Sequence, residues 1–147
     1  MQVHGTKTVH LTPGETYQLL TDPDVLARAM PGLKRLTVLS EHQYEGELEV
    51  GVAGIKGHYK SQIELTDVVP EESYRMLIHG EGPMGFLEAN VALSLTQQGE
   101  DCLIAYDGDA TVGGTVAGVG QRVLAGVAKL LIGQFFNGIA REAAALR

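Results

Sequence analysis

The residues that could carry chemistry are scattered along this chain. Its five histidines fall on separate segments with no HxxxH or HExxH spacing, and Cys102 is its single cysteine. Zinc sites need three or four such ligands brought together, so the spacing predicts no metal site. There is no GxSxG, Walker or dinucleotide motif, and the glycine-containing run at 112–118 lacks the lysine of a phosphate loop. The sequence therefore offers no motif that assigns catalytic residues.

The sequence feature that most resembles an acid cluster is a row of three carboxylates. Glu45, Glu47 and Glu49 alternate with apolar residues, and lysines occur in the next alternating run. We interpret them as a solvated, charge-paired surface, because opposite charges across neighbouring strands stabilise a sheet. His58 and His79 also have outward strand parity, and we interpret both as surface residues.

A lysine and three tyrosines have inward parity. Lys7 would be a functional candidate if its amine were buried, since burial changes a lysine pKa. The favoured alternative is that its stem lies on apolar surface while the amine reaches solvent. Tyr44, Tyr59 and Tyr106 could offer hydroxyls to a ligand carbonyl or find partners in the wall, and both interpretations stay open.

The clearest element that could position such residues is a hairpin made of the runs YEGELEV and IKGHYKSQIEL. Apolar and polar residues alternate along both runs, which is typical of strands with one face in water. Folding them about a four-residue turn at 51–54 sets Glu49 opposite Lys56 and Glu45 opposite Lys60. Each such pair contributes about 0.2–1 kcal/mol, and a one-residue slip would turn the apolar face outward. In this register the inward residues include Tyr44, Leu48, Ile55 and Tyr59.

Two short helices follow a first strand predicted at 2–11. Thr12 and Glu15 have the spacing of a capping box, which starts the first helix. Asp22 can cap the second. Three further strands are predicted at 74–80, 86–96 and 102–112, with a loop at 80–85.

From about Thr115 the apolar period changes to 3.6. This predicts one amphipathic helix of about 30 residues, roughly 45 Å long. The helix has four basic residues and one acidic residue, a charge of +3, so the rest of this −7 chain carries −10. Phe135 shares the core stripe of this helix, and we expect Phe136 to pack on the short helices or to lie exposed.

This order of elements predicts an α+β helix-grip fold, in which a strongly curved antiparallel sheet of about six or seven strands wraps around the long C-terminal helix. Several inward positions are glycine or alanine, and small residues facing each other leave volume for an apolar ligand. We predict one apolar cavity between sheet and helix, lined by Leu48, Ile55, Tyr59, Met76, Ile78, Leu87, Ala89, Val91, Tyr106, Val127, Leu131 and Phe135.

The composition is that of an ordinary globular protein. With 147 residues, 44% hydrophobic and 20% charged, the chain predicts a single domain over 1–147. A net charge of −7 without a basic cluster argues against a nucleic-acid partner. There is no signal-like N-terminus and no apolar run of roughly 18–20 residues. We expect a cytoplasmic protein.

The course of the chain resembles the START-like helix-grip superfamily (SRPBCC, the polyketide cyclase and lipid-transport proteins). Within it, the chain resembles the family of the carbon monoxide dehydrogenase G subunit. The resemblance covers nearly the whole sequence, and the order and spacing of its motifs carry it. These motifs are Asp22-Pro23, Met30-Pro31-Gly32, GIKGHY at 54–59, LTDV at 65–68, YDGD at 106–109, Val112-Gly113-Gly114, Gly120-Gln121-Arg122 and Phe135-Phe136.

The resemblance implies hydrophobic-ligand binding without catalysis, as a carrier or accessory protein for a molybdenum hydroxylase of the carbon monoxide dehydrogenase type. It implies a bound quinone or lipid and no other cofactor. Some members carry a C-terminal extension that could anchor them to a membrane. This chain stops at Arg147, so we expect no anchor, and peripheral membrane contact stays open.

Two other functions also stay open. The first is a cyclase- or hydrolase-type enzyme on the same fold, since fold alone does not decide function. The second is a protein-docking module with a closed core.

Overall fold

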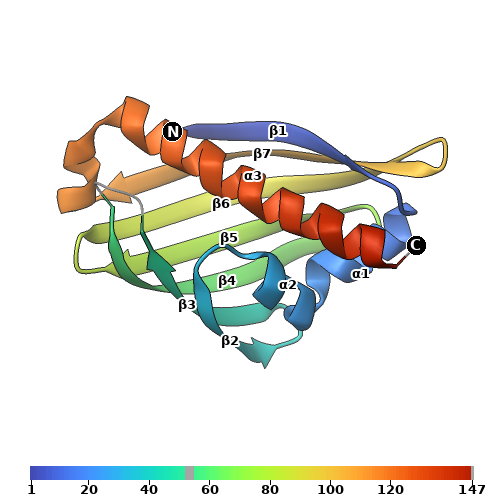
Figure 1. Ribbon diagram of the computed structural model, residues 1–147, viewed down its shortest axis with the longest axis horizontal. Helices are drawn as coiled ribbons and strands as arrows, with labels where there is room; N and C mark the ends of the chain where they lie inside the picture. The colour runs from blue at the N-terminus through green and yellow to red at the C-terminus, as the bar shows by residue number, and fades with distance from the viewer. Residues whose placement is uncertain (52–54, 147) are drawn as a thin grey trace.

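The computed structural model describes residues 1–51 and 55–146. Its elements follow the predicted order, with one additional strand, β2, after the two short helices (Figure 1). The elements are β1 (Gln2–Val9), α1 (Pro13–Thr21), α2 (Pro23–Ala29), β2 (Leu33–Ser40), β3 (Gln43–Val50), β4 (Gly57–Val69), β5 (Ser73–Gly82), β6 (Gly85–Gln98), β7 (Asp101–Gly113), the 3-10 helix η1 (Thr115–Val119) and α3 (Gln121–Ala145).

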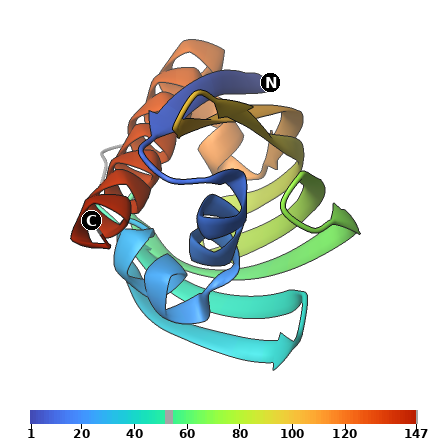
Figure 2. The ribbon, with the colours of Figure 1, turned by 90° about the vertical axis from the view of Figure 1, so that its right-hand side faces the viewer.

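The seven strands form one antiparallel sheet in the order β1-β7-β6-β5-β4-β3-β2. The sheet curves around α3, and α1 and α2 cover one end of the space it encloses (Figure 2). The first and last strands of this order remain edges, so the sheet does not close into a barrel. This arrangement confirms the predicted helix-grip architecture.

The short helices begin where the sequence predicts. The Glu15 amide donates to the Thr12 hydroxyl at 3.1 Å, and the Thr12 amide donates to the Glu15 carboxylate at 3.0 Å. These two bonds complete the predicted capping box. The Asp22 carboxylate accepts from the Asp24 amide at 2.9 Å, which caps α2.

The predicted register of the β3–β4 hairpin is wrong by two residues. Glu47 lies opposite Lys60 and Glu49 lies opposite His58, whereas Glu45 faces Gln62. A two-residue shift keeps every side chain on its predicted face, because strand parity has a period of two. The predicted turn residues 52–54 lie outside the described residues, but the paired strands end at Val50 and resume at Gly57.

Two predicted boundaries also change. The loop predicted at 80–85 is a tight hairpin, in which β5 runs to Gly82 and β6 begins at Gly85. The long helix is interrupted at Gly120, whose φ of 96° separates η1 from α3. A positive φ of this size favours glycine, so the continuous helix predicted from Thr115 is shortened to 25 residues.

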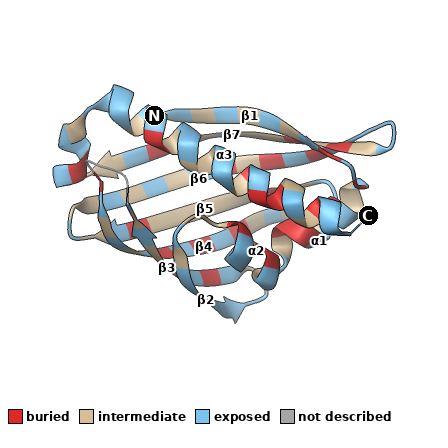
Figure 3. Cartoon of the chain, in the orientation of Figure 1, coloured by how far each residue is buried: buried red, intermediate tan, exposed pale blue. Residues whose placement is uncertain are grey.

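The apolar interior consists of a large and a small cluster of buried residues. The large one contains Ile104 and Ile139, both fully buried, and lies under α1, α2 and the C-terminal half of α3. The small one is made of Ile55, Val116 and Val127. Buried positions on α3 accordingly gather toward its C-terminal half (Figure 3).

The outer face of α3 remains in water. Val123 and Leu130 are 45% and 48% exposed, although both belong to the apolar stripe expected of this helix. By length and composition α3 would be able to cross a membrane, with a mean hydropathy of 1.5 in its most apolar stretch. In this fold it lies across the sheet and contacts β1, α1 and α2.

At Gly138, α3 approaches the backbone of α2 closely. A Cβ atom at this position would lie 2.9 Å from the Cα atom of Ala29 in α2. Beside this contact the Arg28 guanidinium donates to the Glu142 carboxylate at 2.6 Å. Glycine thus allows α2 and α3 to pack backbone to backbone.

We predict that Gly138→Ala lowers the free energy of unfolding by about 1–3 kcal/mol, because the added methyl group overpacks this contact. Gly133→Ala is the matched control, since a Cβ at Gly133 meets no atom within 4 Å. That substitution should be neutral or stabilise the protein by up to about 1 kcal/mol, owing to the higher helix propensity of alanine. Urea titration of both variants measures the difference. Equal stabilities would show that the two helices are not in close contact.

Candidate ligand-binding site

Eight of the twelve predicted cavity residues lie on strands and face the concave side of the sheet, Ile55 lies just before β4, and Val127, Leu131 and Phe135 lie on α3. Six of the twelve belong to the large cluster or pack against it: Met76, Ile78, Ala89, Val91, Tyr106 and Phe135. Three belong to the small cluster or pack against it: Ile55, Val127 and Leu131.

The remaining three, Leu48, Tyr59 and Leu87, are half-buried and belong to neither cluster. They are inward-facing apolar side chains between two packed regions, and they retain accessible surface. The single cavity lined by all twelve residues stays a prediction. These three side chains mark where such a cavity would lie.

The small size of the inner-face glycines predicts empty volume above them. The structure does not leave that volume empty at every such glycine. A Cβ on Gly5 would lie 2.5 Å from the Tyr106 hydroxyl oxygen, and one on Gly82 would lie 2.6 Å from the Tyr59 ring. Tyrosine rings therefore occupy the space above these glycines. Gly80 differs, because a Cβ there would approach no atom closer than 3.8 Å.

The inward tyrosine hydroxyls have different partners. Tyr59 donates to the Ile55 carbonyl at 2.6 Å, and Tyr44 lies 3.4 Å from the Thr21 and Glu41 carbonyls. Partial burial raises the pKa of the Tyr59 and Tyr44 hydroxyls, so both stay protonated donors at neutral pH. The hydroxyls of two of the three inward tyrosines therefore have backbone carbonyls of the protein as partners.

The third tyrosine lies in an aromatic stack. The Tyr106 ring stacks on Phe136 with centroids 5.1 Å apart and an interplanar angle of 20°. The sequence predicts Phe136 on the short helices or exposed, and instead it is 7% exposed and faces the sheet. Phe135, the predicted lining residue, is only partly buried beside it.

The amine of Lys7 lies toward the solvent, which is the alternative that the sequence analysis favoured. Its amine donates to the Asn137 side-chain carbonyl of α3 at 3.2 Å, at an exposed position. Lys7 therefore links the edge strand β1 to the helix, and its charge is not buried in the interior.

Ser61 is the inner-face residue that sequence analysis missed. It lies between the inward-facing Tyr59 and Ile63 on β4, and it is 8% exposed. Its hydroxyl oxygen is buried and has no hydrogen-bond partner in the part of the chain that the structure describes. Strand parity alone, counted from Tyr59, would have placed this polar side chain inside.

One hollow that the described residues outline lies on the other, outer face of the sheet and has a volume of about 560 Å³. Most of its lining side chains have outward parity, including Gln62, His79, Glu88 and Asn90. Its lining mixes charged and amide groups such as Glu88 and Asn90 with apolar side chains such as Leu39 and Leu77.

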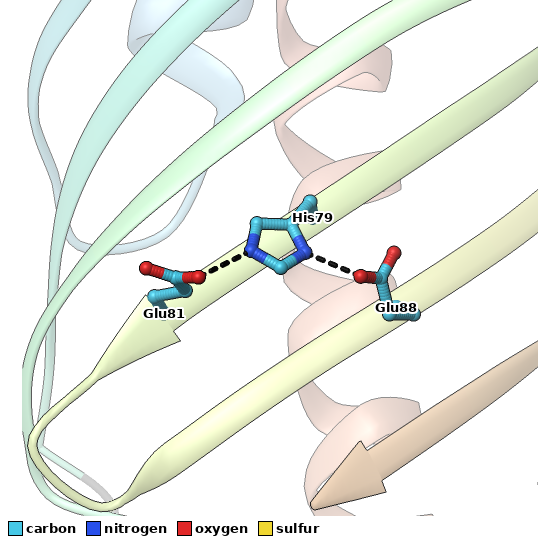
Figure 4. Close-up of polar contacts among 3 residues, drawn as sticks. All are labelled: His79, Glu81 and Glu88. Atoms are coloured by element: carbon cyan, nitrogen blue, oxygen red, sulfur yellow. Dashed lines mark hydrogen bonds and ion pairs between the residues drawn. The ribbon is translucent and has the colours of Figure 1, made fainter.

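On this outer face His79 lies between two carboxylates (Figure 4). Its Nε2 is 2.8 Å from Glu81 and its Nδ1 is 2.5 Å from Glu88. These hydrogen bonds, first to Glu81 and then to Glu88, raise the pKa of the imidazole. Both ring nitrogens are engaged by carboxylates, and the described residues contain no group of three or more such ligands able to hold a metal ion. His79 is therefore an ion-paired surface residue, consistent with its outward parity.

Comparison with known proteins identifies the family. The family model of CoxG, the G subunit of carbon monoxide dehydrogenase, matches residues 5–144. The chain belongs to the CoxG family. No curated protein matches it in sequence.

Solved structures agree with this assignment. A conserved protein from Geobacillus kaustophilus is 39% identical, with a TM-score of 0.95, over 99% of this chain and 96% of that chain. A START superfamily protein from Mycobacterium smegmatis, 12% identical, covers 99% of both chains with a TM-score of 0.80. The Zhui aromatase/cyclase from Streptomyces sp. R1128 is 16% identical over 98% of this chain and 93% of that chain, with a TM-score of 0.69. The two distant structures show that this CoxG-family chain has the helix-grip fold.

We predict that replacing both carboxylates of the His79 cluster, Glu81→Gln with Glu88→Gln, lowers the pKa of His79 toward about 6.5. Because the folded-state pKa is raised, the stabilisation is complete below about pH 6.5 and is lost as pH rises through the folded-state pKa. NMR titration of the imidazole gives the pKa directly. Glu45→Gln, on the same face but two strands away, should leave it unchanged. A His79 pKa insensitive to the double substitution would contradict these ion pairs.

Proposed function

We propose that this protein binds an apolar molecule, a quinone or a lipid, between the curved sheet and α3 and performs no chemistry on it. The observation that carries this proposal is the separation of the two apolar clusters, with the half-buried Leu48, Tyr59 and Leu87 between them. Ligand pockets are lined mainly by apolar and aromatic side chains with few polar groups. Membership of the CoxG family and the START-like fold support a binding role.

The inner face supports a role without catalysis. General acid–base chemistry needs a titratable group within hydrogen-bond reach of the reacting atom. At the inward strand positions that the structure describes there are no carboxylates and no imidazoles. The amine of Lys7 is directed to Asn137 at an exposed position.

A cyclase-type reaction is the second candidate, because an aromatase/cyclase shares this fold. The inner hydroxyls of Tyr59, Ser61 and Tyr106 would be its available polar groups. Release of the applied compound unchanged favours binding, whereas a new product would favour the cyclase.

The family name supports an accessory role beside a molybdenum hydroxylase of the carbon monoxide dehydrogenase type. In this proposal the protein works in the cytoplasm, and its lone buried cysteine, Cys102, is in keeping with a reducing compartment.

The exposed face of α3 is the surface we propose for contact with an acidic partner or an anionic membrane. It carries Arg122, Lys129 and Arg141, and the one acidic residue of the helix, Glu142, is paired with Arg28.

We predict that Ala89→Phe abolishes binding of an apolar fluorescent probe, because the ring fills the space between sheet and helix beside Ile78. The substitution should lower the free energy of unfolding by about 1–3 kcal/mol if the site is tightly packed, and by much less if it is open. Ala92→Phe is the matched control, on the same strand but on the outer face, and should leave binding intact. Probe titration, and native mass spectrometry followed by organic extraction of the wild type, provide the measurements. A wild type that binds no apolar molecule, together with a severely destabilised Ala89→Phe variant, would favour the docking module with a closed core.

We predict that Arg122→Glu with Lys129→Glu weakens sedimentation with vesicles of anionic lipid at low salt and leaves the fold intact. Exposed charges contribute only about 0–1 kcal/mol to stability, whereas basic residues near an anionic membrane contribute about 1 kcal/mol each to binding. Arg35→Glu with Lys60→Glu, on the outer face of the sheet, is the matched control. Vesicles of neutral lipid should bind neither variant. Unchanged sedimentation of the α3 variant would exclude this face as the membrane contact.

A further inference from the structure

Ser61 lies in the middle of a row of small residues that crosses three strands of the inner face. It faces Gly46 on β3 and Gly80 on β5. The next residue of the row is Leu87 on β6, opposite Gly80. Leu87 belongs to neither apolar cluster, and Ser61 lies along the chain between Ile55 of the small cluster and Ile63 of the large one. The row therefore crosses the inner face in the region between the two packed regions.

The two glycines differ in what surrounds them. A Cβ at Gly46 would lie 3.0 Å from the Ser61 hydroxyl oxygen and 3.3 Å from a methyl group of Leu33. A Cβ at Gly80 would meet nothing closer than 3.8 Å. The hydroxyl thus lies toward Gly46, and there is more room on its other side, above Gly80. Rotation about χ1 between staggered positions would carry the oxygen to that side.

An unpartnered hydroxyl in this place requires an explanation. Buried side-chain polar groups in folded proteins nearly always have a hydrogen-bond partner, and an unsatisfied one destabilises the protein. Ser61 is only 8% exposed, and its oxygen has no partner among the described residues. It is also the only serine or threonine at an inward-facing strand position in the described chain. An apolar side chain would suit the surrounding wall better if the site never received a polar group.

We propose that the Ser61 hydroxyl donates a hydrogen bond to a carbonyl oxygen of an otherwise apolar ligand, and so fixes how that ligand lies above Gly80. This inference rests on the proposed function, and it specifies the ligand: an apolar body that carries a carbonyl group. Quinones and fatty esters share this chemistry. The hydroxyl distinguishes both from hydrocarbons of the same shape, because a site built around a hydrogen bond disfavours the analogue that cannot make it.

The test compares matched probes on wild type and on Ser61→Ala. One pair is 2-methyl-1,4-naphthoquinone and 2-methylnaphthalene, and the other is methyl oleate and 1-octadecene. The second member of each pair lacks the carbonyl group. Ser94→Ala, an exposed serine on the outer face of β6, is the matched control. Thermal unfolding of the ligand-free proteins is measured in parallel.

The expected result is about five- to tenfold weaker binding of a carbonyl probe to Ser61→Ala, with unchanged binding of its hydrocarbon partner. The pair that shows this difference identifies the source of the carbonyl group, a quinone or a lipid ester. Without ligand, Ser61→Ala should unfold at the same or a higher temperature than wild type, since the substitution removes an unsatisfied hydroxyl. A structural role would instead lower that temperature.

Two results would overturn the assignment in distinguishable ways. If the probes bind wild type and Ser61→Ala equally, or if both members of a pair weaken together, Ser61 does not bind a carbonyl group and the proposed binding function stands. If no probe binds wild type, the proposed function and this inference both fail. Gly80→Ala adds a second measurement, because its methyl group fits the fold and occupies the space above Gly80. It should weaken the same carbonyl probe, and unchanged binding would place the ligand elsewhere.

Discussion

The backbone contact between Gly138 of α3 and Ala29 of α2 decides where the long helix can lie. Around it the C-terminal half of α3 is held firmly, since Ile139 is fully buried and Phe136 stacks on Tyr106 of the sheet. A helix of 25 residues is close to a rigid rod over its roughly 37 Å length. Fixing one half of α3 therefore fixes the direction of the other half across the concave face.

The packing under α3 is uneven as a consequence. The C-terminal half lies on the large cluster, together with both short helices, whereas the N-terminal half is held by the small cluster around Val127. A curved sheet and a straight helix cannot stay equally close along their whole length. The region between the clusters contains the half-buried Leu48, Tyr59 and Leu87. The fold therefore rests on packing at both ends of α3, and these three side chains contribute less buried surface to it.

The sequence predicted which way side chains point far better than which residues pair. Parity along β3 and β4 was right, because burial of one face imposes a period of two. The register was not, because glutamates recur every second residue along β3. Glu47 lies opposite Lys60 in the observed register, in the place that Glu45 takes in the predicted one. Charge pairing cannot distinguish two registers that differ by two residues, and only the length of the connection between the strands does.

Other differences between the predicted and the observed structure arose from contacts between elements distant in sequence. Phe136 lies off the stripe that begins with Val116, and its burial depends on the curvature that brings Tyr106 against it.

Ser61 shows how a polar residue can be informative where apolar residues are not. Leucines and valines on the inner face are explained equally well by a packed core or by a pocket, so they cannot distinguish the two. A buried hydroxyl without a partner lowers the stability of the empty protein, and a wall that only had to pack would be more stable without it. Its position between two glycines associates that loss with the site above Gly80, where a Cβ would approach no atom closer than 3.8 Å. Since most proteins retain only a small margin of stability, a destabilising group is most readily explained where it serves binding. The same reasoning does not apply to Lys7, whose amine has a partner on α3 and lies exposed at the sheet edge.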